Sequence, residues 1–245
     1  MAKLKPNQFL LDSHLITERP ILYQTEMVKS VLHGLKKQTR RTKGLDYLNI
    51  NTPSDWIFDL RLIERFFFKH INYPNSSGLD FFCPYGKPGD LLWVRETWCN
   101  MQTASKPEDN GIRFRASTEK NNFTWKPSIH MPKAAARIWL MVEDVKVERL
   151  QHISEEDAID EGIQFGKGID YKGWHYDYEA NLYNLSNAKS SFKTLWKSIN
   201  GQASWQANPW VWVIKFRELS RTGHPSEETI LKNHLQVIGE EVAHV

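Results

Sequence analysis

The sequence has few cysteines and no long apolar run, and both absences restrict the class of protein. Only 2 of the 245 residues are cysteines, Cys83 and Cys99, and they are too far apart for a C-x-x-C motif. Reduced thiols, as in a cytosol, are therefore expected, with a disulfide as the alternative. No apolar run approaches the roughly 18 residues of a membrane span, and residues 1–15 lack the apolar core of a signal peptide. We expect a soluble cytoplasmic protein with no membrane partner.

Signatures of the commonest nucleotide-binding, protease and hydrolase families are also missing. The sequence contains no G-x-x-x-x-G-K-[ST], G-x-G-x-x-G, H-E-x-x-H or G-x-S-x-G. Its 9 histidines have no ligand spacing, so no metal site is predicted. The net charge is only +3, from 32 basic and 29 acidic side chains, which argues against strong non-specific binding to nucleic acid. Any anion-binding site must therefore be a local cluster.

The apolar periodicity predicts separate strands and short helices without a regular βα alternation. Apolar pairs four residues apart predict a helix over residues 25–32, with Thr25 as its cap and Gly34 as its left-handed exit. Ser154 and Asp157 form a capping box for another short helix. Strands are expected over 91–94, 138–147 with a bend at 143–144, and 211–216, and further helices over 191–199 and from 226 onward. This order of elements favours an α+β class, with a small mixed barrel or sheet.

The same patterns predict the domain organisation. We expect one elaborated domain over residues 1–219, followed by an amphipathic helical tail over 220–245. Three polar or mixed stretches near 42–80, 100–133 and 164–188 interrupt the domain as insertions, and the first is expected to contain helical parts.

A basic cluster follows the first predicted helix, in the sequence GLKKQTRR. One interpretation is a solvated basic turn, because cations are favourable at a helix C-terminus. In the other, Lys36 and Thr39 lie on the same side of a turn, and Arg40 and Arg41 lower the pKa of Lys36 by like charge. A lysine of this kind can act as base for a threonine hydroxyl that attacks an acyl carbon. Such a pair needs an acid or an oxyanion partner from elsewhere in the chain.

Several other residues are candidates for a binding or catalytic site. Glu161 lies in a last helical turn, where its charge is unfavourable to the helix dipole, so it is either a functional residue or plain surface charge. Glu96 follows a buried strand and is a rival carboxylate, unless it forms a structural pair with Arg95. Trp98 lies at a strand end, where it could stack on a nucleobase or pack under its own loop.

The order of these motifs resembles the ASCH family of the PUA-like superfamily. G-x-K-x-x-T-x-R after a short helix is followed by PGDLLWV, a strand leading into an Ile-Ser-Glu helix, and a closing WVIKF strand. The segments CPYGKPGDLLWVRETW, KPSIHMPKAAARIWL and NPWVWVIKF look like longer members from tailed phages and prophages. The resemblance covers most of residues 19–219, but only about half of them at the level of the minimal core. It implies a PUA-like β-barrel with flanking helices, acting on RNA or modified nucleosides in a bacterial host cell.

Within the family, the motif is similar to that of the N4-acetylcytidine amidohydrolases. Position by position, the resemblance assigns the catalytic lysine to Lys36, the threonine to Thr39 and, if the helices align without a gap, the glutamate to Glu161. Many family members have glutamate where Thr39 stands, so this chain is similar to the amidohydrolase subgroup there. Arg41 would stabilise the oxyanion or hold the substrate, and no metal or organic cofactor is required. Substrate contacts are also expected from Arg40, Arg95, Glu96 and Trp98.

Three functional hypotheses remain open from the sequence. The first is a phage or prophage protein that recognises a nucleobase or modified nucleoside in a basic cleft and hydrolyses an N4-acyl amide. The second is a module that binds nucleic acid, RNA rather than DNA, without chemistry. The third is an interaction protein that docks a partner through its C-terminal helix.

Overall fold

The computed structural model describes residues 4–50, 52–62, 64–100, 111–119, 123–168 and 173–243. Each of the three predicted insertions therefore includes positions outside the described residues: 51 and 63, then 101–110 and 120–122, then 169–172. The chain forms two compact units, and each unit is built from separate stretches of sequence. Unit 1 comprises Met1–Gly34, Pro88–Glu143 and Phe216–Val245, and unit 2 comprises Leu35–Lys87 and Asp144–Lys215.

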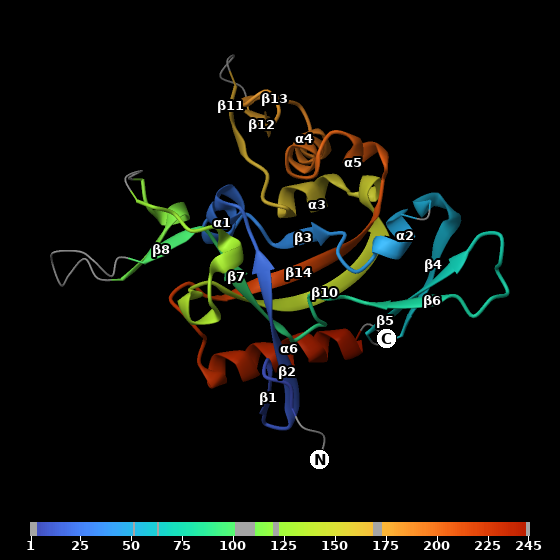
Figure 1. Cartoon of the computed structure of the whole chain (residues 1–245), viewed down its shortest axis with the longest axis horizontal. Coiled ribbons are helices and arrows are strands. Elements are labelled where there is room, and N and C mark those ends of the chain that lie inside the picture. Colours follow the sequence, from blue (N-terminus) through green and yellow to red (C-terminus); the bar gives the residue numbers. More distant parts are fainter. Residues whose placement is uncertain are drawn as a thin grey trace. The chain divides into compact units, whose positions relative to one another are not determined.

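Unit 1 begins with a hairpin of β1 (Gln8–Leu11) and β2 (His14–Leu22) (Figure 1). The hairpin turn consists of Asp12 and Ser13, which both have positive φ, as the tightest two-residue hairpin turns require. Strand β2 then pairs in parallel with β7 (Leu91–Arg95), and β7 pairs antiparallel with the start of β10 (Trp139–Arg149). The predicted strand at 91–94 is thereby confirmed.

Helices and short strands complete unit 1. Helix α1 (Thr25–Leu32) has the predicted bounds and the predicted exit at Gly34, whose φ is +71°, but its N-cap is Gln24 and not Thr25. The remaining elements are β8 (Trp98–Asn100), β9 (Ile112–Phe114), the 3₁₀ turns η3 (Arg115–Ser117), η4 (Ser128–His130) and η5 (Lys133–Ala135), and α6 (Glu227–Ala243).

The core of unit 1 includes one side of the C-terminal helix. Ile230 and Val237 of α6 pack in a buried cluster with Ile16, Leu91 and Trp139. A helix is present where the tail helix was predicted, over Glu227–Ala243, and the side that carries Ile230 and Val237 packs within its own unit.

Unit 2 contains β3 (Gln38–Arg41), which pairs antiparallel with the first half of β14 (Trp210–Ser220). Helices α3 (Glu155–Asp160) and α4 (Ala188–Asn200) pack against one face of these strands. Their shared core is lined by Ala158, Phe192, Trp196, Val211 and Val213, with further members from 150–163 and Ala188. The predicted helices at 154–162 and 191–199 are confirmed, and the second is longer than predicted.

Two small sheets in unit 2 occupy the stretches that were predicted as insertions. The first joins β4 (Trp56–Leu62), β5 (Arg65–His70) and β6 (Leu79–Phe82), next to the short α2 (Asp46–Ile50) and η1 (Pro53–Asp55). The second joins β11 (Phe165–Lys167), β12 (Gly173–Asp177) and β13 (Leu182–Leu185). Unit 2 also contains η6 (Leu150–His152) and α5 (Ala203–Gln206). The helical content predicted for 42–80 is small, because the aromatic run Phe66–Phe68 forms a strand.

Strands β10 and β14 belong to the largest sheet, whose hydrogen-bonding order is β1-β2-β7-β10-β14-β3. This order begins and ends with different strands, β1 and β3, so the sheet is open and the predicted closed barrel is not present among the described residues. The α+β class is confirmed, because strands in sheets predominate and the helices lie between them in the sequence. Within the described ranges, no helix is long and apolar enough to cross a membrane.

Candidate functional site

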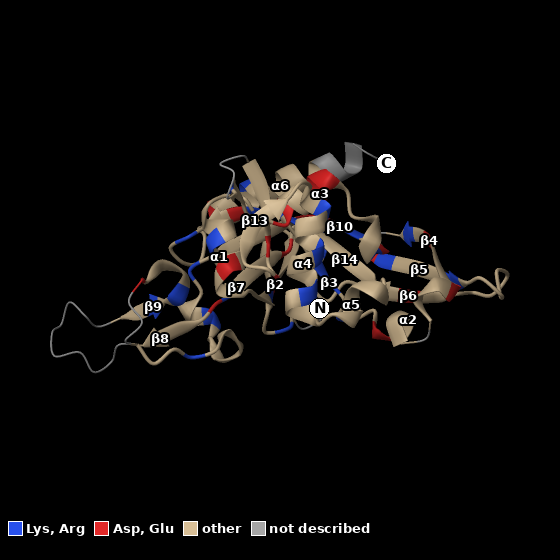
Figure 2. Ribbon diagram, turned by 90° about the horizontal axis from the view of Figure 1, so that it is seen from above, with Lys and Arg blue, Asp and Glu red and all other residues tan. Residues whose placement is uncertain are grey.

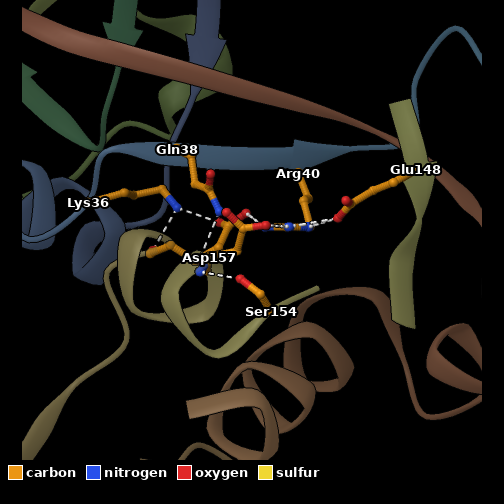
Figure 3. Close-up of polar contacts among 7 residues, drawn as sticks. Lys36, Gln38, Arg40, Glu148, Ser154 and Asp157 are labelled. Atoms are coloured by element: carbon orange, nitrogen blue, oxygen red, sulfur yellow. Dashed lines mark hydrogen bonds and ion pairs between the residues drawn. The ribbon is translucent and has the colours of Figure 1, made fainter. Parts of the chain in front are cut away.

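The best-defined polar cluster of unit 2 lies between β3 and α3 (Figure 3). Lys36 enters just before β3 and forms an isolated antiparallel bridge with Glu161, at the end of α3. Its Nζ donates to the Glu161 carboxylate Oε2 at 2.8 Å and to the Glu161 backbone carbonyl at 2.8 Å. The Lys36 side chain has no exposed surface, and that of Glu161 is 4% exposed. The structure therefore brings these two candidates together, although 125 residues separate them.

Arg40 connects Glu161 to two further carboxylates. Its Nη1 donates to Glu161 Oε1 at 3.1 Å, and its Nη2 donates to Asp157 Oδ2 at 3.0 Å and to Glu148 Oε1 at 2.7 Å. The guanidinium is fully buried and lies over the ring of Phe192. Arg40 is therefore saturated by protein groups, and the substrate contact predicted for it finds no support in this arrangement.

Local sequence rules explain why α3 meets β3 at this point. The Ser154 hydroxyl caps α3 by accepting from the Asp157 backbone N–H at 3.0 Å, as the capping box predicted. Gly162 ends the helix with a φ of +80°. The side-chain amide of Gln38 then donates to the Asp157 carbonyl at 2.8 Å, and the Lys37 backbone N–H donates to the Asp160 carbonyl at 2.7 Å. The Asp157 carbonyl also accepts from the Glu161 backbone N–H, whereas the terminal carbonyls of Asp160 and Glu161 are satisfied by the Lys37 N–H and by Lys36 Nζ.

Burial and the neighbouring charges shift the pKa values of the two basic residues in this cluster. The pKa of Lys36 is lowered from 10.5 mainly because burial penalises the ammonium ion, while the contact with Glu161 raises it. The charges of Arg41 and Arg40 lower it further, but they are the smaller causes. The predicted direction is therefore confirmed, and its predicted main cause is wrong. Burial also lowers the pKa of Arg40, but the three carboxylates outweigh this effect and its pKa is raised overall.

Thr39 lies on the other face of β3. Gln38 and Arg40 both contact α3, and successive side chains of a strand point to opposite faces. The pairing with β14 agrees, because Val213 lies opposite Arg40 and packs in the α3–α4 core, whereas Ile214 lies opposite Thr39. Lys36 and Glu161 are therefore together, and the Thr39 hydroxyl points away from them.

Arg41 lies on the same face of β3 as Thr39, and aromatic residues surround this face. Trp212 lies directly opposite Arg41 in the strand pairing, and its ring packs edge-on against Phe66 at a centroid distance of 4.8 Å. The Trp212 Nε1 is buried and has no hydrogen-bond partner among the described residues. Burial raises the pKa of Tyr85, and the positive charge of Arg41 opposes this rise. The basic residues of β3 (blue in Figure 2) are Arg40 and Arg41, and of these only Arg41 is partly exposed.

The remaining predicted site residues lie in unit 1, where they have structural contacts. Glu96 is buried and accepts a bidentate pair of bonds from Arg137, Nε to Oε1 and Nη2 to Oε2, both at 2.8 Å. Burial raises the pKa of Glu96, and Arg137 opposes the rise. The structural pair suggested for Glu96 therefore exists, but its partner is Arg137 and not Arg95. Arg95 packs over the Trp93 ring and donates to the Ile129 carbonyl.

Trp98 is buried as well, with 7% of its surface exposed, and it pairs with Phe114 in the β8–β9 ladder. Lys126 lies 5.1 Å from the centre of its ring. Of the two interpretations given for Trp98, packing agrees with the structure, because its ring is part of the buried hydrophobic cluster of unit 1. Cys83 and Cys99 are both buried, and neither forms a disulfide.

Sequence reasoning missed several residues of these clusters. Glu148, Arg137, Tyr85 and Trp212 were not predicted, and Asp157 was predicted only as part of the helix cap. Glu148 and Arg137 carried a weak signal, since each charged residue lies in or next to a buried strand and therefore needs a partner. Their partners are 108 and 41 residues away, and no local pattern reports such a contact.

Comparisons with protein-family models, with curated proteins and with solved structures found no match. The ASCH resemblance therefore rests on the motifs quoted above. No group of three or more metal-binding side chains occurs within the described ranges. The three carboxylates around Arg40 converge on its guanidinium.

Proposed function

We propose that this chain binds a nucleobase or modified nucleoside, within RNA or free, through the face of β3 that carries Arg41. The observation that supports binding best is Arg41 itself, a partly exposed basic side chain at the end of β3 whose charge acts on Tyr85. A guanidinium can contact a phosphate or the acceptor edge of a base. The partly exposed ring of Tyr85 can stack on a base, whereas Trp212 is fully buried. The resemblance of GLKKQTRR to the ASCH motif supports the same class of ligand.

The separation of Thr39 from Lys36 supports binding over hydrolysis. A general base must lie within hydrogen-bond reach of its nucleophile, or one water away. In β3 the candidate nucleophile points to one face, while the candidate base is ion-paired with Glu161 on the other. On this proposal, Lys36, Arg40 and Glu161 fix α3 against β3 and thereby hold the strand that presents Arg41.

Titration with single-stranded RNA and DNA oligonucleotides and with modified nucleosides tests the proposal. Arg41→Ala should weaken RNA binding about tenfold and, if Arg41 contacts a phosphate, reduce the salt slope by about 0.7 for a single strand. Lys146→Ala is the matched control, because it removes an exposed lysine of the same unit and should change affinity less than twofold. An unchanged affinity in Arg41→Ala, or no binding by the wild type, would remove nucleic acid from this face.

A second candidate is the N4-acylcytidine amidohydrolase, and one observation favours it. Lys36 has a lowered pKa and contacts a carboxylate, which is a common feature of catalytic sites. In that mechanism neutral Lys36 takes the proton of Thr39 and the Thr39 oxygen attacks the acyl carbon. The C–N bond then breaks as protonated Glu161 gives its proton to the leaving amine, and water hydrolyses the acyl ester on Thr39. This requires a rearrangement that brings Thr39 to the α3 side of the strand.

Incubation with a panel of acylated nucleosides, followed by mass spectrometry, separates the two candidates. If the chain is a hydrolase, Thr39→Val abolishes turnover and leaves substrate affinity within a few-fold, while Thr39→Ser retains part of the activity. If the wild type leaves every acylated nucleoside intact, or if Thr39→Val turns over normally, the hydrolase candidate is wrong. In a binding protein, loss of the Thr39 hydroxyl costs at most about 1 kcal/mol of affinity.

A further inference from the structure

Unit 1 contains a cavity of about 400 Å³ between the end of α1 and the η3 segment. Lys29, Leu32 and His33 line it from the helix, and Arg115, Ala116 and Ser117 are among the residues that line it from the other side. Its volume lies within the roughly 300–1,000 Å³ that is typical of small-molecule sites. Figure 2 shows both basic and acidic residues on α1, and basic residues around β9, which precedes η3. None of the residues predicted from the sequence as a site lines this cavity.

Arg115 belongs with Arg95 and Arg149, whose partners in the described parts of the chain are backbone carbonyls and aromatic rings, and differs from the arginines that are held by carboxylates. Arg40, Arg137 and Arg217 each donate to at least one carboxylate. Arg115 has no carboxylate partner among the described residues. Its Nη1 donates to the Thr118 carbonyl at 2.9 Å, and its guanidinium lies 5.8 Å from the centre of the Trp125 ring. These two neutral contacts orient the guanidinium and leave most of its donors for another partner.

Two other polar groups of the cavity, Lys29 and Ser117, also favour an anion, whereas Glu119 lines the cavity as well and its carboxylate opposes one. Lys29 pairs only with an exposed neighbour, Glu26, at 2.8 Å, which is a weak interaction in water. The Ser117 Oγ accepts a bond from Arg137 at 2.9 Å, so its own proton remains to be donated. The carbonyls at the end of α1 account for a cation at Lys29 but not for Arg115, which comes from a different element.

We propose that this cavity binds the phosphate of a nucleotide-sized ligand, with Arg115 as its bidentate anchor. A guanidinium matches two phosphate oxygens at once, and Lys29 and Ser117 add a charge and a hydrogen-bond donor. The apolar side chains of Leu32 and Ala116 line the rest of the cavity and suit the uncharged part of the ligand. The phosphate belongs to a free nucleotide or to a nucleic-acid strand. This inference does not depend on the Arg41 face, which lies in the other unit.

Calorimetric titration of the full chain tests the proposal with four probes: adenosine 5′-monophosphate, adenosine, inorganic phosphate, and a short single-stranded oligonucleotide with a 5′-phosphate. The monophosphate should bind at least tenfold more tightly than adenosine. Arg115→Ala should weaken its binding at least tenfold, and Arg115→Lys should restore only part of it, because lysine keeps the charge and loses the planar pair of donors.

Lys232→Ala is the matched control, because Lys232 is an exposed lysine on α6 of the same unit and does not line the cavity. It should leave the affinity unchanged within twofold. Binding of the oligonucleotide without the monophosphate identifies a strand as the source of the phosphate, and the reverse result identifies a free nucleotide. If neither binds, or if Arg115→Ala and Arg115→Lys both bind as the wild type does, the proposal is overturned. Arg41→Ala should not affect this site.

Discussion

The two faces of β3 carry similar residues in opposite situations. On the α3 side, Lys36 and Arg40 are buried and held by carboxylates. On the other side, Arg41 is partly exposed, beside Tyr85 and opposite Trp212. Arg40 and Arg41 are neighbours in the sequence, yet the first is fully buried among carboxylates and the second is partly exposed. Consecutive basic residues in a strand therefore do not form one basic surface, because their side chains point alternately to opposite faces.

The two faces of β3 differ in how much folding free energy is lost when a charged side chain loses its partner. A buried ion that loses its partner keeps its desolvation penalty, whereas an exposed ion is stabilised by water. Substitutions on the α3 side should therefore change folding stability, and substitutions on the Arg41 side should change binding.

The largest effect is expected from Glu161→Ala. This change leaves the Lys36 ammonium buried without its carboxylate and removes one of the three carboxylates of Arg40. We expect a loss of about 3–5 kcal/mol in the free energy of unfolding, measured with urea. Asp160→Ala is the control, because its contact with Lys37 is long, at 3.7 Å, and partly exposed. It should cost less than about 1 kcal/mol, and equal losses in the two variants would contradict the distinction between buried and exposed pairs.

A smaller effect is expected in the pH dependence of stability. The folded-state pKa of Lys36 lies below the usual lysine value of 10.5, so between these two values the unfolded chain binds more protons than the folded chain. The contribution of Lys36 should therefore make the protein more stable as the pH rises through this interval, and it is lost as the pH falls through the folded pKa. Lys36→Met should remove this contribution. Denaturation curves at several alkaline pH values, compared between wild type and variant, test the sign, and parallel curves would contradict it.

The smallest effect on stability is expected from Arg41→Ala. Because Arg41 is partly exposed, its removal should change the free energy of unfolding by less than about 1 kcal/mol, while Arg40→Ala should cost several times more. Thermal unfolding of both variants under the same conditions measures the ratio of the two stability losses. If Arg41→Ala is as damaging as Arg40→Ala, the Arg41 side is structural and the binding proposal loses its site.

Elements set by local rules were predictable from the sequence. The bounds of α1, the cap of α3 by Ser154 and the strand at 91–94 depend on neighbours within a few residues, and the structure agrees with them. The sheet of β11–β13 was not predicted, because glycine is unfavourable in strands. There, the rings of Tyr183 and Phe165 pack close to Gly166 and Gly173, so side chains from other strands supply the packing that the glycines lack.

The candidate site was predictable only in part, for a geometric reason. Residues three apart, such as Lys36 and Thr39, lie on one side of a turn or helix but on opposite sides of a strand. The sequence predicted a turn, and the chain forms a strand from Gln38. The proximity of Lys36 to Glu161 was reached through the family resemblance alone, since local periodicity carries no information about contacts across 125 residues.

The alternation of side chains along β3 also restricts which mutations this strand can tolerate during evolution. Adding or deleting one residue between Gln38 and Arg41 would exchange the two faces, because the side-chain period of a strand is two. Arg41 would then enter the carboxylate cluster, and Arg40 would face outward. The lineage of this chain should therefore accept substitutions at the outward positions of β3 more readily than any insertion or deletion within it.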